Sequence, residues 1–194
     1  MMQSSHQTSA AGQAVPGDPQ VEFVAVDDAR TREAARHLLT EYLEWIGHAA
    51  SSNYGLDFEI SAMVESDLAD PVKFFPPLGR FYVVRHAGEF VGVGCLKQLT
   101  PTIGEVQRMY IQPRARGLGA GRLLVERLLA DARAIGYTAV RLESLKVLSA
   151  AHALYRSVGF RDIAPYAENS MKDYQAVDKL DTYRSSALFM ELRL

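Results

Sequence analysis

Cysteine is almost absent from this sequence, and its scarcity excludes two kinds of architecture. Cys95 is the single cysteine among 194 residues, so the chain cannot form an internal disulfide framework or a zinc site built on cysteines. Its five histidines show no metal-ligand spacing either. We therefore expect no metal site, and a reducing compartment such as the cytoplasm fits this composition best.

Long apolar runs and an excess of either charge are missing as well. No stretch reaches the roughly 18 apolar residues that a membrane helix needs, and residues 1–20, rich in Ser, Gln, Ala, Gly and Pro, contain no signal-peptide core. Lys and Arg number 21 against 23 Asp and Glu, a net charge of −2, which leaves no broad basic face for nucleic acid. We expect a cytoplasmic protein that binds neither membranes nor nucleic acid, with a disordered tail over residues 1–20 and one domain over residues 21–194.

The hydrophobic pattern of the first half predicts strands around two helices. Alternation over residues 21–26 indicates a strand, and an apolar stripe after Asp27-Asp28 indicates a helix to about His48. A short helix is expected over residues 60–68. The loop His86-Ala87-Gly88 joins two strands as a hairpin, and a third strand at Glu105 to Ile111 completes a meander.

Strands and helices alternate in the second half. A helix that turns Leu123, Leu124, Leu128 and Leu129 inward should stop at Gly136. A strand at 138–142, a helix near 149–158 and a closing strand at 187–194 follow. Residues 164–186 are polar and poorly periodic. Together these elements predict a single α/β domain with a mixed, mostly antiparallel central sheet and helices on both faces.

Three glycines mark the place where the third strand ends and a helix begins. At a helix start, unpaired backbone N–H groups and the positive end of the helix dipole converge. Gly117, Gly119 and Gly121 let the backbone approach an anion closely, and arginines flank them. Their spacing is neither that of a dinucleotide-binding loop nor that of a nucleotide-triphosphate loop, so the pattern favours another diphosphate.

Two motifs here resemble the GNAT family of N-acetyltransferases. Arg114-Ala115-Arg116-Gly117-Leu118-Gly119 matches the family's Arg/Gln-x-x-Gly-x-Gly/Ala signature, and residues 104–111 look like the strand that precedes it. Residues 151–160 are similar to the second motif, which ends in Leu-Tyr-x-x-x-Gly-Phe. One departure is Leu148, where many members carry an asparagine that contacts the cofactor, and Ser149 is a candidate substitute.

The resemblance implies an enzyme that binds acetyl-CoA and transfers its acetyl group directly to a primary amine of a small molecule or peptide, through a tetrahedral intermediate. It implies a pyrophosphate site on the loop and helix start, strand-like pairing of the pantetheine arm with the preceding strand, and an oxyanion stabilised by a backbone N–H near Met109 or Tyr110. The cofactor-binding residues expected on this basis are Met109, Tyr110, Ile111, Arg114, Arg116, Gly117, Leu118, Gly119, Ala120, Gly121, Arg122, Ser149 and Ala151.

Two catalytic roles follow from the same resemblance and from strand periodicity. Tyr155 occupies the position of the acid that protonates the leaving thiolate, with a core tyrosine as the alternative. Glu105 shares a strand face with Gln107 and Met109 by the period of two, unless a bulge interrupts the strand, and is a candidate base for the amine. The alternatives for Glu105 are a solvated carboxylate or a partner of Arg108.

Other readings of the sequence stay open. Cys95 as an acyl-carrying nucleophile is disfavoured against a buried core residue, because no basic residue adjoins it. Trp45 is expected to be core. A non-catalytic acetyl-CoA sensor or interaction module is the alternative function, and a homodimer remains a possible assembly. We also expect residues 164–186 to border the acceptor pocket or cover it.

Overall fold

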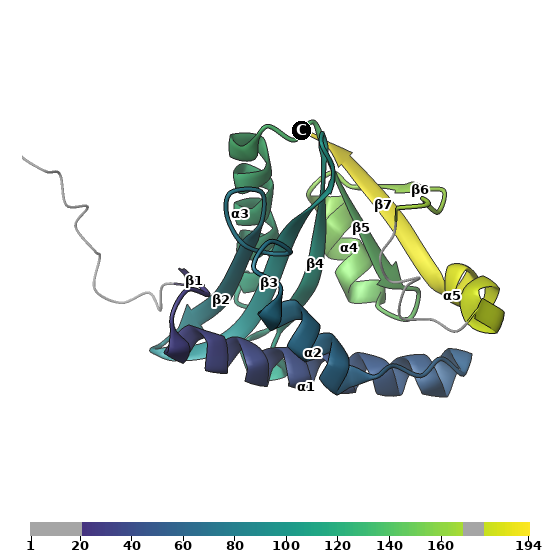
Figure 1. Cartoon of the computed structure of the whole chain (residues 1–194), viewed down its shortest axis with the longest axis horizontal. Helices are drawn as coiled ribbons and strands as arrows, with labels where there is room; N and C mark the ends of the chain where they lie inside the picture. The colour runs from purple at the N-terminus through teal and green to yellow at the C-terminus, as the bar shows by residue number, and fades with distance from the viewer. Residues whose placement is uncertain (1–20, 169–176) are drawn as a thin grey trace, which may run out of the picture.

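One seven-stranded sheet organises the domain (Figure 1). The computed structural model describes residues 21–168 and 177–194, so the expected disordered tail lies outside the described residues. The strand order is β1-β2-β3-β4-β5-β7-β6, and only β4 and β5 run parallel. The strands are β1 (Glu22–Ala25), β2 (Arg80–His86), β3 (Glu89–Thr100), β4 (Ile103–Ile111), β5 (Ala139–Leu145), β6 (Arg161–Ile163) and β7 (Ala187–Arg193).

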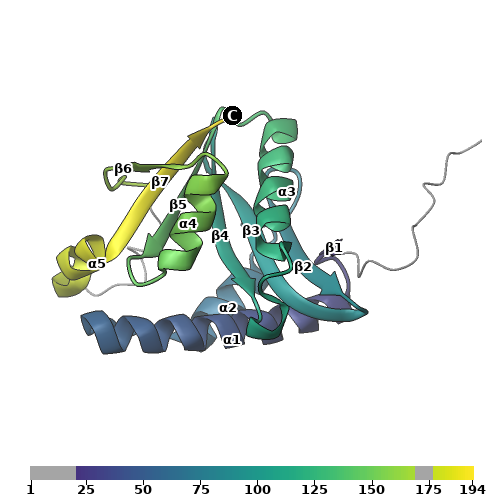
Figure 2. The same cartoon turned by 180° about the vertical axis from the view of Figure 1, so that it is seen from behind.

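Helices cover both faces of this sheet, which confirms the predicted α/β architecture. One face packs on α1 (Ala29–Tyr54) and α2 (Ile60–Ala69), and the other packs on α3 (Ala120–Ile135) and α4 (Ser149–Ser157), as the reverse view shows (Figure 2). Each face has its own apolar cluster. Leu38 and Leu39 of α1 belong to one cluster, and Leu124 and Leu128 of α3 belong to the other.

Two details of the predicted helices are wrong. The first helix begins with Asp28 as its N-cap, as expected, but it continues to Tyr54, where Gly55 adopts a left-handed conformation that ends it. It outlasts the predicted end because Ala50, past His48, is fully buried against the core. Leu123 is 45% exposed, whereas Leu124, Leu128 and Leu129 are buried as predicted, because Leu123 lies at the edge of the buried stripe of α3.

The strand β4 contains a bulge, so strict alternation fails. Val93 pairs with Tyr110 and Cys95 with Gln107, which leaves Gly94 opposite both Arg108 and Met109. Arg108 takes up the extra residue with a φ of 55°. Glu105 and Gln107 consequently face α1 and α2, whereas Met109 packs with the cluster under α3. The predicted common face of Glu105 and Met109 is therefore wrong.

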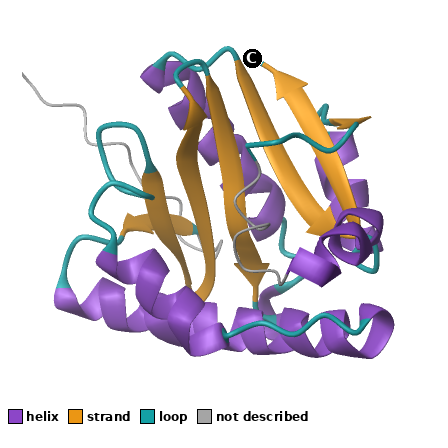
Figure 3. Cartoon of the chain, turned by 45° about the vertical axis from the view of Figure 1, so that its right-hand side comes forward, coloured by secondary structure: helices purple, strands orange, loops and turns teal. Residues whose placement is uncertain are grey.

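A gap between two neighbouring strands positions the site. β4 and β5 pair only from Ile103–Ala139 to Glu105–Arg141. Beyond these pairs the two strands separate, and they diverge further toward the end where α1 crosses the sheet (Figure 3).

The connection over residues 164–186 holds more structure than its sequence indicates. It ends in a 3-10 turn (Val177–Lys179) and the helix α5 (Leu180–Ser186), which carries the buried side chains Tyr183 and Ser186. Residues 169–176, and with them Asn169, Lys172 and Tyr174, lie outside the described residues.

Candidate active site

The gap between β4 and β5 opens into a groove of about 550 Å³, within the range of small-molecule sites. We call it the β4–β5 groove. Its walls come from β4, the glycine loop, the start of α3, β5 and α4, with Tyr42 and Trp45 of α1 at one side. The predicted cofactor-binding residues that line it are Met109, Tyr110, Ile111, Arg116, Gly117, Gly119, Ala120, Gly121, Arg122, Ser149 and Ala151.

The glycine loop leaves a helix start uncapped and open. Gly117 and Gly119 have φ values of 82° and 77°, a region that side chains other than glycine rarely adopt. A Cβ at either position would meet nothing within 4 Å, so this backbone is in contact with open space. Gly119 is the N-cap of α3 and supplies no side-chain acceptor. The first N–H groups of α3 therefore remain available to an anion, and the loop fits a phosphate group.

The arginines near the loop have different positions. Arg116 lies over the rings of Trp45 and Tyr110 and donates to the Ile111 carbonyl. Arg122 lines the groove and donates a hydrogen bond of 2.7 Å to the Ser157 hydroxyl.

The structure does not bring two predicted residues to the groove. Arg114 bonds to Glu89 and to Gln112, on the side of β3. Leu118, at the tip of the loop, is half exposed and does not line the groove. Sequence matching selects such residues because they belong to the motif, but the loop turns their side chains outward.

Tyr155 of α4 lines the groove. It is almost fully buried, and its ring packs edge-on against Phe160 at 5.9 Å. Burial raises the pKa of its hydroxyl, so the group keeps its proton at neutral pH. The position of the hydroxyl and its protonation state both suit a proton donor. The ring of Tyr155 also packs in the core, so the structure fits the core alternative as well.

Glu105 is one of the most buried charged groups in the described part of the chain, at 1% exposure. Its carboxylate accepts hydrogen bonds from Tyr166 at 2.6 Å and Gln107 at 2.7 Å, and Lys97 lies 3.2 Å away. The solvated alternative is therefore wrong. Arg108 is not its partner, because the Arg108 guanidinium pairs with the buried Asp67 of α2 through an Nε–Oδ2 distance of 2.5 Å.

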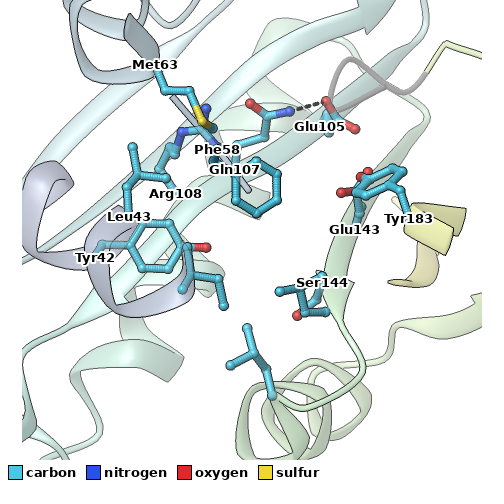
Figure 4. Close-up of a pocket in the computed structure, with 13 residues that line it drawn as sticks. Tyr42, Leu43, Phe58, Met63, Glu105, Gln107, Arg108, Glu143, Ser144 and Tyr183 are labelled. Atoms are coloured by element: carbon cyan, nitrogen blue, oxygen red, sulfur yellow. Dashed lines mark hydrogen bonds between the residues drawn. The ribbon is translucent and has the colours of Figure 1, made fainter. Parts of the chain in front are cut away.

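A second cavity, of about 70 Å³, adjoins the groove and shares part of its lining (Figure 4). We call it the side cavity. Glu105, Gln107, Arg108, Glu143 and Ser144 supply its polar groups. Its apolar lining comes from Leu43, Ile46, Phe58, Met63, Leu145 and Leu148, and Tyr42 and Tyr183 add aromatic rings that each carry a hydroxyl.

Glu143 is the acidic residue of this site that sequence reasoning missed. It lines both the groove and the side cavity. Burial, and then repulsion by Glu105, raises the pKa of its carboxyl well above the usual range. The predicted strand from Thr138 ended at Leu142, and only its extension to Leu145 brings Glu143 to the site. The buried Val140 and Leu142 assign Glu143 to the other face of the strand, and this pattern does not distinguish a site residue from a surface residue.

Trp45 and Cys95 also have predicted positions that the structure tests. Trp45 is 44% exposed and lines the groove, so its predicted core position is wrong. It sits there because α1 crosses the sheet beside the β4–β5 gap. Cys95 is fully buried as expected, and burial raises the pKa of its thiol well above the normal value, which disfavours a nucleophilic thiolate.

Comparison with known proteins agrees with this geometry. Residues 51–160 match the acetyltransferase (GNAT) family. An "IAA acetyltransferase" of Azospirillum brasilense is 36% identical over 138 residues, which span 70% of this chain and 82% of the relative. The chain belongs to the GNAT acetyltransferase family and is an acetyltransferase by that membership.

Solved structures share the fold. A GNAT acetyltransferase from Staphylococcus aureus superposes with a TM-score of 0.68 at 13% identity, over 90% of this chain and 99% of that one. PaiA N-acetyltransferase from Thermoplasma acidophilum, solved in complex with coenzyme A, gives a TM-score of 0.63 at 15% identity, over 90% and 99%. Across the described ranges, none of the helices combines the length and apolar character that crossing a bilayer requires.

Proposed function

We propose that this protein transfers the acetyl group of acetyl-CoA directly to a primary amine. The observation that carries the proposal is that the β4–β5 groove adjoins the side cavity. The wall of the groove contains an uncapped helix start, and the lining of the side cavity contains two carboxyl groups, of Glu105 and Glu143. The groove suits a long ligand with a diphosphate, and the adjoining side cavity suits a second, smaller ligand.

Groups of the chain itself would hold acetyl-CoA in the groove. The backbone from Arg116 to Arg122 offers donors to the pyrophosphate, and the β4 edge at Met109 and Ile111 has no strand partner on the β5 side after Glu105. Ser149 and Ala151 flank the same space from α4. When bound, acetyl-CoA supplies an activated acetyl thioester. A backbone N–H near Met109 or Tyr110 is the proposed stabiliser of the carbonyl oxygen, at the bulge of β4.

Tyr155 and Glu105 have the proposed proton-transfer roles. Tyr155 donates its hydroxyl proton to the departing thiolate, supported by its place in the groove wall and by the raised pKa that keeps it protonated. Glu105 accepts the proton of the attacking amine, directly or through water. Its contacts with Tyr166, Gln107 and Lys97 hold the carboxylate in a fixed place in the lining of the side cavity.

The acceptor is proposed to be a small-molecule or peptide amine that enters the side cavity. Tyr166 contacts Glu105 and Tyr183 lines the cavity, which supports a role for residues 164–186 at the acceptor site. We also propose a cytoplasmic location, supported by the single unpaired, fully buried Cys95, while the homodimer stays a prediction.

Cofactor binding can be tested with a reporter that the chain already carries. Trp45 is the sole tryptophan and lines the groove, so a titration with acetyl-CoA should change its fluorescence. Acetyl-CoA should also raise the Tm of the wild type and not that of Gly119→Trp, whose side chain would enter the open space at the helix start. The variant brings a second tryptophan, so Tm is its readout. No shift and no fluorescence change at millimolar acetyl-CoA would refute the proposed cofactor.

Catalysis needs a separate measurement, because a non-catalytic sensor would also bind. Thiol release from acetyl-CoA should depend on an added amine, and Glu105→Gln should lower the amine-dependent rate most at lower pH, where free amine is scarce. Glu33→Gln is the matched control, since Glu33 is exposed on α1 far from the groove lining. Binding without amine-dependent thiol release would favour the sensor.

A further inference from the structure

Two polar atoms of the side cavity are buried without a hydrogen-bonding partner among the described residues. They are Oε2 of Glu143 and the hydroxyl oxygen of Tyr183. Both residues line the cavity, and Figure 4 shows them on one side of it, across from Tyr42, Leu43 and Met63. Buried polar atoms in proteins are nearly always hydrogen-bonded. These two atoms therefore indicate a ligand that brings its own donors.

The charges around the cavity indicate the sign of that ligand. The Arg108 guanidinium is engaged by Asp67, and the Lys97 ammonium lies beside Glu105. Glu143 has no such cation in direct contact among the described residues. An incoming cation would thus find an acidic partner at Glu143, whereas an incoming carboxylate would meet both Glu105 and Glu143.

Size and walls restrict the rest of the ligand. The cavity measures about 70 Å³, well below the range of sites for drug-sized ligands. Leu43 and Met63 lie opposite the acidic side, and Ile46 and Phe58 are further apolar residues of the lining (Figure 4). A second charge placed against this wall would lose its hydration without gaining a partner. The wall accordingly suits a short uncharged chain.

We propose that the acceptor is a small primary monoamine with an apolar chain, whose ammonium group is held by Glu143 and Tyr183. This inference rests on the proposed function and specifies its substrate class. Two of the three ammonium donors satisfy the two partnerless oxygens, and the apolar chain lies against the wall from α1 and α2. Amino acids, diamines and lysine side chains in peptides are poor acceptors, because each adds a charge or a backbone that the cavity cannot accommodate.

A bound ammonium also fits the electrostatics of Glu143. Burial and the neighbouring Glu105 raise the pKa of this carboxyl in the free protein. A cation in the cavity offsets both effects, since it supplies an opposite charge at contact distance. Glu143 is therefore a positioning and specificity-determining residue, separate from the proposed base Glu105.

A matched pair of acceptors provides the main test. 3-Methylbutylamine and leucine share their branched chain and amine and differ only by the α-carboxylate. Thiol release should give kcat/KM at least about 100-fold higher for 3-methylbutylamine, the scale expected when a site opposes a charge at close range. 1,4-Diaminobutane and a lysine-containing peptide should be poorer than butylamine. A preference for leucine, for the diamine or for the peptide overturns the proposal.

Two variants then locate the amine. Glu143→Gln keeps the shape of the side chain and should raise KM for 3-methylbutylamine at least about tenfold, with KM for acetyl-CoA unchanged. Tyr183→Phe removes only the hydroxyl and should raise KM roughly two- to tenfold. Glu33→Gln, on the exposed face of α1, is the control for a lost carboxylate. Equal KM values in the wild type and both variants overturn the proposal.

Failure of the proposed function can be told apart from failure of this inference. Calorimetry with 3-methylbutylamine and the coenzyme A complex measures amine binding without turnover. Binding to the wild type that Glu143→Gln weakens supports the site even where no thiol is released, and then it is the transfer reaction that fails. Thiol release with leucine equal to that with 3-methylbutylamine leaves the acetyltransferase intact and removes the substrate class.

Discussion

The buried carboxylate of Asp67 provides a test of which interactions hold the bulge of β4 in place. Its carboxylate is fully buried and lies 2.5 Å from Nε of Arg108 and 2.5 Å from Nζ of Lys73. Arg108 is the residue with positive φ at the β4 bulge. Asp67 thus fixes from α2 the part of β4 that separates the groove from the side cavity.

Replacing Asp67 by Asn should destabilise the protein strongly, because it removes the fully buried carboxylate that pairs with both Arg108 and Lys73. Breaking a buried pair by removing one partner costs about 3–5 kcal/mol. For a chain of this size roughly 2–4 °C of Tm corresponds to 1 kcal/mol, so the Tm should fall by about 6–20 °C. Thermal and urea unfolding measure the loss, and KM for the amine should rise as the bulge relaxes.

The neighbouring residue Glu65 supplies the matched control. It also pairs with an arginine, Arg36, but both side chains are largely exposed. Glu65→Gln should therefore cost no more than about 1 kcal/mol. The double replacement Asp67→Leu with Arg108→Met should recover part of the stability that Asp67→Asn loses, since no unpaired charge stays behind on β4. If Asp67→Asn and Glu65→Gln are equally mild, the buried pair does not secure the bulge.

Three further results are expected. Tyr155→Phe should lower kcat about 100-fold with little change in acetyl-CoA affinity, and unchanged turnover would leave Tyr155 a packing residue only. The pKa of the Glu143 carboxyl is raised above 4.5 in the folded protein, so this group lowers the free energy of unfolding as pH rises from that value. Glu143→Gln should therefore have a higher Tm than the wild type at pH 7, and the difference should shrink toward pH 4.5. A difference in Tm that does not change with pH would contradict the raised pKa. Cys95→Ala should keep kcat within about twofold, as direct transfer requires, and loss of turnover in a folded variant would indicate an acyl-cysteine.

Local signals in the sequence were sufficient for the order of the elements and for the glycine loop. Alternation and turn residues placed the β2–β3 hairpin correctly, and Gly136 ended α3 as predicted. Such features depend on the conformational preferences of a few adjacent residues. The family motifs likewise lie in short continuous segments, so that most residues expected along the groove do line it.

The side cavity could not be foreseen, because its residues come from segments far apart in the chain. Tyr42 belongs to α1, Glu143 to β5 and Tyr183 to α5, and no periodicity links them. The bulge in β4 had the same effect within a single strand: one extra residue at Arg108 reversed the faces that a period of two assigns.

The sequence by itself determined the fold class and the place of the glycine loop, since both are encoded in local patterns. Tertiary structure alone decided which side chains meet beside that loop. It left Arg114 outside the groove, placed Trp45 in its wall and brought the carboxyl of Glu143 close enough to Glu105 for the two to repel each other. The physical reason is that burial, and with it the pKa of a carboxyl or the need for a hydrogen-bonding partner, depends on what packs around a residue and not on its neighbours in the chain.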